Sequence, residues 1–116
     1  MSTLTDKRVL VIDDDRHVRG LLELVFRHTG AQVYLAASGE EGLRQFFAYQ
    51  PHLVVLDVMM PGMDGWAVCE RLRQLADVPI IFLSALGDEQ DIIRGLDLGA
   101  LDYVTKPFSP QILVAR

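Results

Sequence analysis

Short apolar runs alternate with longer amphipathic stretches along the whole chain. Four runs, at residues 9–12, 53–56, 79–83 and the weaker 102–105, are continuous, while a fifth at 31–36 is more mixed. The stronger runs are short, unalternating and rich in β-branched residues, which is typical of strands buried on both faces of a parallel sheet. The pattern therefore predicts five strands, with the sheet covered on both sides.

The stretches between these runs carry apolar residues at helical spacing. Ser38 and Glu41 form a capping box, and Gly99 stands where the fourth helix should stop. Ser109 followed by Pro110 predicts the start of a fifth helix, which the sequence cuts short. The predicted apolar stripes of the four complete helices are Val18, Leu21, Leu22, Val25 and Phe26; Leu43, Phe46 and Phe47; Val68, Leu72 and Leu75; and Ile92, Ile93 and Leu96.

Strand and helix thus alternate five times. This order demands a parallel sheet with right-handed crossovers and helices on both faces, so we expect an α/β doubly wound fold. A chain of 116 residues has room for one core, and residues 1–116 are interpreted as a single domain. Ligands of such sheets bind beyond the carboxyl ends of the strands, which makes those ends the place to search for function.

Composition narrows the class of protein. Half of the residues are hydrophobic, which is enough to fold, but no apolar run approaches a membrane span. The net charge of −5 disfavours binding to a nucleic-acid backbone. Early charges argue against a secretory signal, and the single Cys69 cannot form a disulfide framework. We therefore expect a cytoplasmic protein that contacts neither membrane nor nucleic acid through this domain.

Polar residues follow the predicted strands at the edge where ligands should bind. Asp13 and Asp14 end the first strand, Asp57 the third, Ser84 the fourth and Lys106 the fifth. Clustered carboxylates repel one another unless a cation enters, and an all-oxygen set favours Mg²⁺, with Mn²⁺ as the alternative, over zinc. One aspartate could then attack a phosphoryl group, with the lysine stabilising the charge that develops.

Each of these residues has a structural explanation when taken alone. Strand-terminal acids often cap the following helix, a role that we assign to Asp15, and an isolated lysine is usually solvated. The loop at 57–65 could owe its shape to its proline and glycines. The joint occurrence at successive strand ends is what favours a phosphoryl site.

The ordered segments "VLVIDDD", "LVVLDVMMPGMDGW", "PIIFLSA" and "GALDYVTKPF" resemble the receiver domain of two-component response regulators over the whole chain. The residues "VTKPFSP" favour the winged-helix transcription-factor branch. The resemblance implies a flavodoxin-like fold with strand order 2-1-3-4-5. It also implies phosphoryl transfer from a sensor histidine kinase onto an aspartate with bound Mg²⁺, without turnover of a separate substrate.

Carried over by position, the resemblance makes Asp57 the phosphoacceptor and implies roles for its neighbours. Asp14 would bind the metal directly, Asp13 through water, and Met59 through its backbone carbonyl. Ser84 and Lys106 would contact the phosphoryl group, and the bond from Lys106 to Pro107 would be cis. Tyr103 would be the switch residue, turning inward when Ser84 moves toward the phosphate.

The resemblance also implies a partner face on the fourth helix, fifth strand and fifth helix. This face could form a homodimer and pass the signal to an output domain beyond residue 116, through which DNA would be bound. Regulators of the winged-helix branch pair charged residues here, whereas this chain has Ile92, Leu101 and Ile112. An apolar contact or a different partner is therefore expected. Met59 and Leu86 flank the acceptor and cannot orient water, which predicts a long-lived phosphoryl state.

The strand-end aspartates could also belong to three other kinds of protein. A haloacid-dehalogenase-type phosphatase needs a second acid at position 59, where this chain has Met59. A dinucleotide-binding domain needs a glycine-rich turn after the first strand, which is absent from the sequence. A pseudo-receiver, an interaction module that is not phosphorylated, remains the alternative, although such domains lose acidic residues or the lysine that this chain retains.

Overall fold

A computed structural model describes residues 4–106 of the chain. Five strands and four helices alternate in the order that the apolar pattern predicted. Their bounds are β1 Arg8–Ile12, α1 Arg16–His28, β2 Gln32–Ala36, α2 Gly39–Tyr49, β3 Leu53–Leu56, α3 Gly65–Leu75, β4 Ile80–Ser84, α4 Glu89–Asp97 and β5 Asp102–Thr105. The predicted fifth helix, with Ser109, Pro110 and Ile112, and the bond to Pro107 lie outside the described residues.

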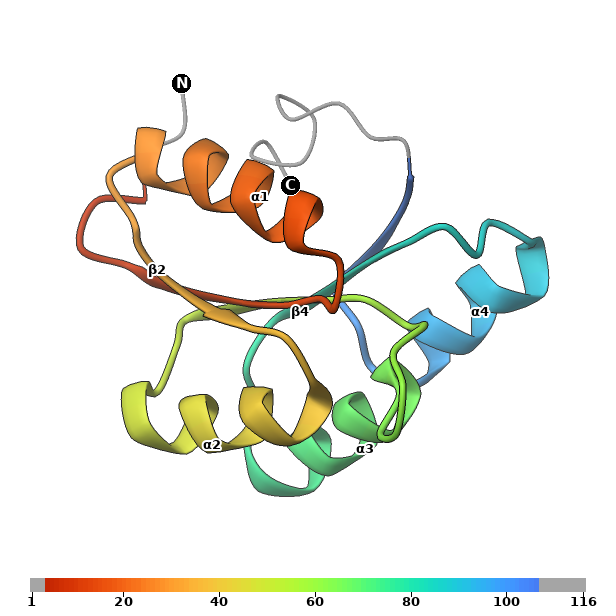
Figure 1. The fold of residues 1–116 in the computed structure, drawn as a ribbon. Helices are drawn as coiled ribbons and strands as arrows, with labels where there is room; N and C mark the ends of the chain where they lie inside the picture. The colour runs from red at the N-terminus through yellow and green to blue at the C-terminus, as the bar shows by residue number, and fades with distance from the viewer. Residues whose placement is uncertain (1–3, 107–116) are drawn as a thin grey trace.

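All neighbouring strands are parallel, in the order β2-β1-β3-β4-β5. The predicted doubly wound α/β fold and its strand order are confirmed. In Figure 1, α1 lies on one face of the sheet, and α2, α3 and α4 lie on the other. The strand that follows β1 in sequence, β2, pairs on one side of it, and β3 pairs on the other side, so the switch point in strand order falls beside the end of β1.

The central strands β1, β3 and β4 are mostly apolar because both of their faces are buried. Residues of β1 alternate between two hydrophobic cores: Val9 and Val11 pack on the α1 side, whereas Leu10 and Ile12 pack on the side of α2 and α3. A continuous apolar run was therefore the right signal for a central strand of this sheet. None of the helices within residues 4–106 is long and apolar enough to cross a bilayer.

Side-chain oxygens fix where three helices begin. Asp15, Ser38 and Asp64 each accept a backbone hydrogen bond in the first turn of the helix that they precede. The N-cap role predicted for Asp15 is confirmed. The predicted capping box of α2 is only half formed, because the Glu41 carboxylate accepts a hydrogen bond from Gln45.

The apolar stripes predicted for the helices are wider than the helix faces that the structure buries. Phe46 is buried, but Phe47, which was expected to face inward, is 58% exposed. Consecutive helical residues point about 100° apart, so only one of the pair can face the sheet. For the same reason the stripe members at the edges are exposed, namely Leu21, Leu75, Ile93 and Leu96.

Candidate functional site

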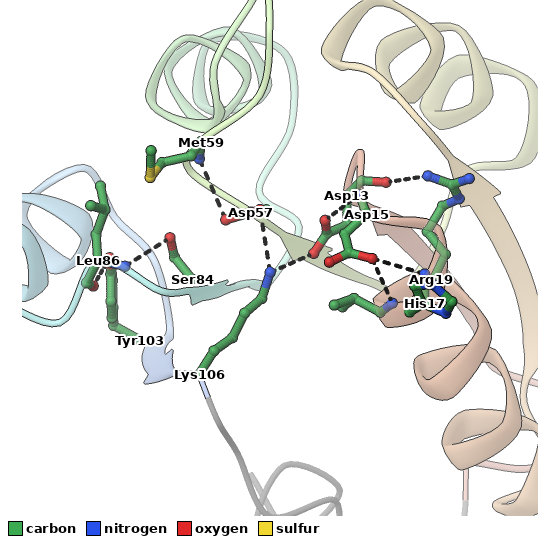
Figure 2. A network of polar contacts seen from close by, with 11 residues as sticks. Asp13, Asp15, His17, Arg19, Asp57, Met59, Ser84, Leu86, Tyr103 and Lys106 are labelled. Atoms are coloured by element: carbon green, nitrogen blue, oxygen red, sulfur yellow. Dashed lines mark hydrogen bonds and ion pairs between the residues drawn. The ribbon is translucent and has the colours of Figure 1, made fainter.

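The parallel sheet brings the predicted polar residues together at one edge. Asp13 follows β1, Asp57 follows β3, and Lys106 follows β5, although 93 residues separate the first from the last. Figure 2 shows the Lys106 side chain reaching between the two carboxylates, with Ser84 beside it at the end of β4. The placement follows from the fold, because every strand of a parallel sheet ends at the same edge.

Lys106 binds both buried carboxylates. Its Nζ lies 3.0 Å from Asp13 Oδ2 and 3.3 Å from Asp57 Oδ2. Asp13 and Asp57 are 2% and 6% exposed. A charge-assisted contact of this kind matters more here than at the surface, because little water screens it. The ammonium therefore holds together two anions that would otherwise repel each other.

The environment shifts the pKa values of Asp13 and Lys106. Burial raises the pKa of Asp13, and the charge of Asp57 raises it further, while the Asp15 amide and Lys106 oppose the shift. Burial lowers the pKa of Lys106, but its hydrogen bond and charge attraction to Asp13, with those to Asp57, outweigh burial and leave the pKa raised. The site thus favours a protonated Lys106, while burial and the neighbouring charge of Asp57 disfavour the charged form of Asp13.

The three acids form a set that could hold a metal ion. One carboxylate oxygen from each of Asp13, Asp14 and Asp57 lies within 4.8 Å of the others. Asp14 is exposed, and the residues 4–106 give its carboxylate no hydrogen-bond or ion-pair partner, so it is available to a ligand from solvent. An all-oxygen donor set beside open solvent fits a hard divalent cation that keeps part of its hydration shell, as Mg²⁺ does.

The loop after β3 shapes the acceptor side of the site. The backbone N–H of Met59 points to Asp57 Oδ1 at 3.4 Å, while the Met59 side chain is 58% exposed. A shallow groove of about 470 Å³ lies next to the acceptor and is lined by Val58, Met59, Met60, Pro61, Asp64, Trp66 and Leu86. Met59 and Leu86, the two apolar residues that the sequence placed beside the acceptor, both line this groove, and Asp64 is its one acidic lining residue.

The predicted switch residues lie side by side on the β4 and β5 side of the acceptor (Figure 2). Ser84 is fully buried, and its Oγ accepts a hydrogen bond from the Leu86 amide at 3.3 Å. Tyr103 is 6% exposed and its hydroxyl donates to the Leu86 carbonyl at 2.6 Å. Burial raises the pKa of the Tyr103 hydroxyl. The backbone of Leu86 thus connects the Ser84 hydroxyl with the inward-facing Tyr103.

The residues of the expected partner face differ in exposure. Leu101 is 61% exposed, whereas Ile92 is partly buried against the core. Ile93 and Leu96, on the same helix, are the more exposed apolar residues of α4. Ile112 lies outside the described residues.

Sequence reasoning missed two residues that build the site. Arg19 Nη1 donates to the Asp13 carbonyl at 2.8 Å and so fixes the end of β1 (Figure 2). Gly65 lets α3 approach the acceptor, because a Cβ there would lie 2.0 Å from the Asp57 carbonyl oxygen. The glycine in "MDGW" was a visible signal of close approach, but the partner could not be named from sequence. Nothing in the sequence marked Arg19 among the charged residues of α1.

Comparison with known proteins agrees with this geometry. Residues 9–116 match the family described as response regulator receiver domain. A probable transcriptional regulator, ycf27 of Cyanophora paradoxa, is 53% identical over 113 residues, which is 97% of this chain and 47% of that protein. The chain therefore spans about half the length of the curated relatives that it matches.

Solved structures give the same result. A putative response regulator from Chloroflexus aurantiacus is 44% identical with a TM-score of 0.91, and the match covers 97% of this chain and 94% of that one. DrrB, described as a Thermotoga maritima OmpR/PhoB homologue, is 33% identical with a TM-score of 0.83 over 97% of this chain and 51% of that one. These relatives are consistent with the winged-helix branch. With five parallel strands in this order and an acid–lysine site at their ends, the chain belongs to the response regulator receiver domain family of two-component systems.

Proposed function

We propose that Asp57 accepts a phosphoryl group from a sensor histidine kinase. The observation that carries the proposal is the Lys106 ammonium within 3.3 Å of Asp57 and 3.0 Å of Asp13 at the rim of the sheet. An Asp57 oxygen attacks phosphorus as the donor's P–N bond breaks, and the imidazole leaves with the bonding electron pair and takes up a proton. Lys106 and Ser84 would donate hydrogen bonds to the oxygens of the transferred group. The chain acts on itself and turns over no separate substrate.

Mg²⁺ is the proposed cofactor, with Mn²⁺ as the alternative. Asp14 and Asp57 would bind it directly, Asp13 through water, and Met59 through its backbone carbonyl. The exposed and unpartnered carboxylate of Asp14 supports its direct role, and the ion pair of the buried Asp13 with Lys106 supports the indirect one. A bound divalent cation supplies charge neutralisation for the acceptor and for the incoming phosphoryl oxygens.

The proposed output runs through Tyr103 to the face of α4 and β5. Phosphorylation would move Ser84, change the Leu86 segment that both side chains contact, and favour the inward Tyr103. The exposed Ile93, Leu96 and Leu101 would then complete a homodimer face or contact an output domain. The names of the relatives support transcriptional control through a DNA-binding output domain; DNA contact by this acidic domain itself is not proposed.

The mass of the intact chain after incubation with acetyl phosphate tests the proposal. We expect one added phosphoryl group that requires Mg²⁺, with Asp57→Asn as the control that removes the acceptor. A chain that binds Mg²⁺ yet gains no mass would instead be a pseudo-receiver, and the proposal would be wrong.

The apolar flanks of Asp57 predict a slow loss of the phosphoryl group. Neither Met59 nor Leu86 can orient an attacking water. Met59→Asn should therefore shorten the lifetime of the acyl phosphate, by up to about a hundredfold if the amide positions a water well. The measurement is the decay of the phosphorylated mass with time, with Met59→Leu as the apolar control. Equal lifetimes for the two variants would contradict the role assigned to this position.

A further inference from the structure

Three aromatic rings lie together near the loop between β3 and α3, residues 57–64, which we call the acceptor loop. The ring centroids of Trp66 and Phe82 are 5.1 Å apart, and those of Trp66 and Tyr103 are 6.4 Å apart with an angle of 26° between the ring planes. Phe82 and Tyr103 close the triangle at 5.7 Å. Aromatic pairs at these distances stabilise each other beyond the area that they bury. The inward position of Tyr103 therefore depends on Trp66 as well as on the Leu86 carbonyl.

Trp66 is also fixed relative to the acceptor. It follows Gly65, whose amide donates to the Val58 carbonyl at 2.8 Å and whose missing Cβ leaves room for the Asp57 carbonyl. The first turn of α3 therefore packs directly on the backbone of the acceptor loop. A shift of that loop would be passed to the indole, which contacts the ring of Tyr103.

Arg94 joins this cluster from α4. Its guanidinium carbon lies 4.6 Å from the centroid of the Trp66 ring, which is a cation–π distance. Gly95 beside it allows α4 to come close, because a Cβ there would be 2.7 Å from the Tyr103 ring. Arg94 is exposed, so the sequence alone would assign it to a solvated helix face.

We propose that Arg94 and Trp66 are positioning residues. Their contact forms a clip between α4 and the first turn of α3, which packs on the acceptor loop, and this clip holds Tyr103 inward. The proposal rests on the proposed function and adds a second connection beside the path from Ser84 through Leu86. Without Arg94, the indole loses its outer cover and the tyrosine loses a fixed neighbour. The fraction of chains with an inward Tyr103 then falls, and so does the apparent affinity for a phosphoryl group or its mimic.

The test uses beryllofluoride with Mg²⁺ as the phosphoryl mimic and ¹⁹F NMR of the bound fluoride. We expect Arg94→Gln to weaken beryllofluoride binding about two- to fivefold, as loss of one exposed cation–π contact would. Arg94→Lys, which keeps a cation, should lose less. Affinity for Mg²⁺ alone should stay unchanged, because the three acids are untouched. Arg71→Gln, an exposed change of the same charge on α3, should bind the mimic like the unmodified chain.

Two further measurements distinguish a positioning role of Arg94 from a general effect on stability. The emission of Trp66, the single tryptophan, should become easier to quench with acrylamide in Arg94→Gln than in Arg71→Gln. In a Tyr103→Leu background, Arg94→Gln should no longer change beryllofluoride affinity, since coupling through the tyrosine has been removed.

The outcomes distinguish the inference from the function on which it rests. If the unmodified chain binds beryllofluoride but Arg94→Gln binds it equally well, or keeps its effect in the Tyr103→Leu background, the clip is wrong and the proposed function stands. If the unmodified chain binds Mg²⁺ but no beryllofluoride, both the proposed function and the clip are wrong.

Discussion

Lys106→Met is expected to slow phosphorylation of Asp57 by at least about a hundredfold, the loss typical of removing one group that stabilises developing charge. The Lys106 ammonium lies 3.0 Å from Asp13 and 3.3 Å from Asp57. From there it would stabilise the negative charge that develops on the oxygens of the transferred phosphoryl group. Methionine keeps an unbranched apolar stem that is one atom shorter than lysine, and it removes the charge and the hydrogen bonds. Mg²⁺ should still bind, since the acids remain and no ammonium competes with the ion for them.

The measurement is the rate of mass gain with acetyl phosphate at saturating Mg²⁺, beside a Mg²⁺ titration of each variant. The chain offers a matched control in Lys7→Met, because Lys7 is the other lysine and is exposed in the turn before β1. Lys7→Met should react at the rate of the unmodified chain. A Lys106→Met variant that also reacts at that rate would refute the role of Lys106 in the transfer.

Gly65→Ala is expected to lower the free energy of unfolding by about 3 kcal/mol or more. The added Cβ would lie 2.0 Å from the Asp57 carbonyl oxygen and 2.7 Å from the Val58 Cα. Both are backbone atoms, so no change of rotamer can relieve the overlap, and either α3 or the acceptor loop must move. A domain of this size should lose roughly 10 °C or more in Tm, and the displaced acceptor should react slowly.

Gly20→Ala provides the control for the same chemical change. Gly20 lies inside α1, and a Cβ there meets no atom within 4 Å. Alanine should therefore stabilise the chain by about 0.5–1 kcal/mol through its helix propensity. Urea and thermal denaturation of both variants give the comparison. If Gly65→Ala proves as stable as Gly20→Ala, α3 does not approach the acceptor as closely as described.

The local apolar pattern of the sequence determined the fold and which residues belong to the site. The apolar run at 53–56 is a strand because it can be buried on both sides, and the helices between strands force a parallel sheet. Since parallel strands end at one edge, Asp13, Asp57 and Lys106 could be placed together from the sequence alone. The sequence could not predict that Lys106 binds both carboxylates, because that contact depends on distances of a few ångströms.

Tertiary packing decided the features without a local signal. Phe46 and Phe47 are equally apolar, and only the position of α2 on the sheet determines that the second is exposed. Arg94 belongs by sequence to a charged helix surface, yet it covers Trp66 because Gly95 lets α4 come near. The sequence by itself determined which residues reach the site, because periodicity and strand ends are local properties. The tertiary structure decided which of them touch, because contact depends on how separate elements pack.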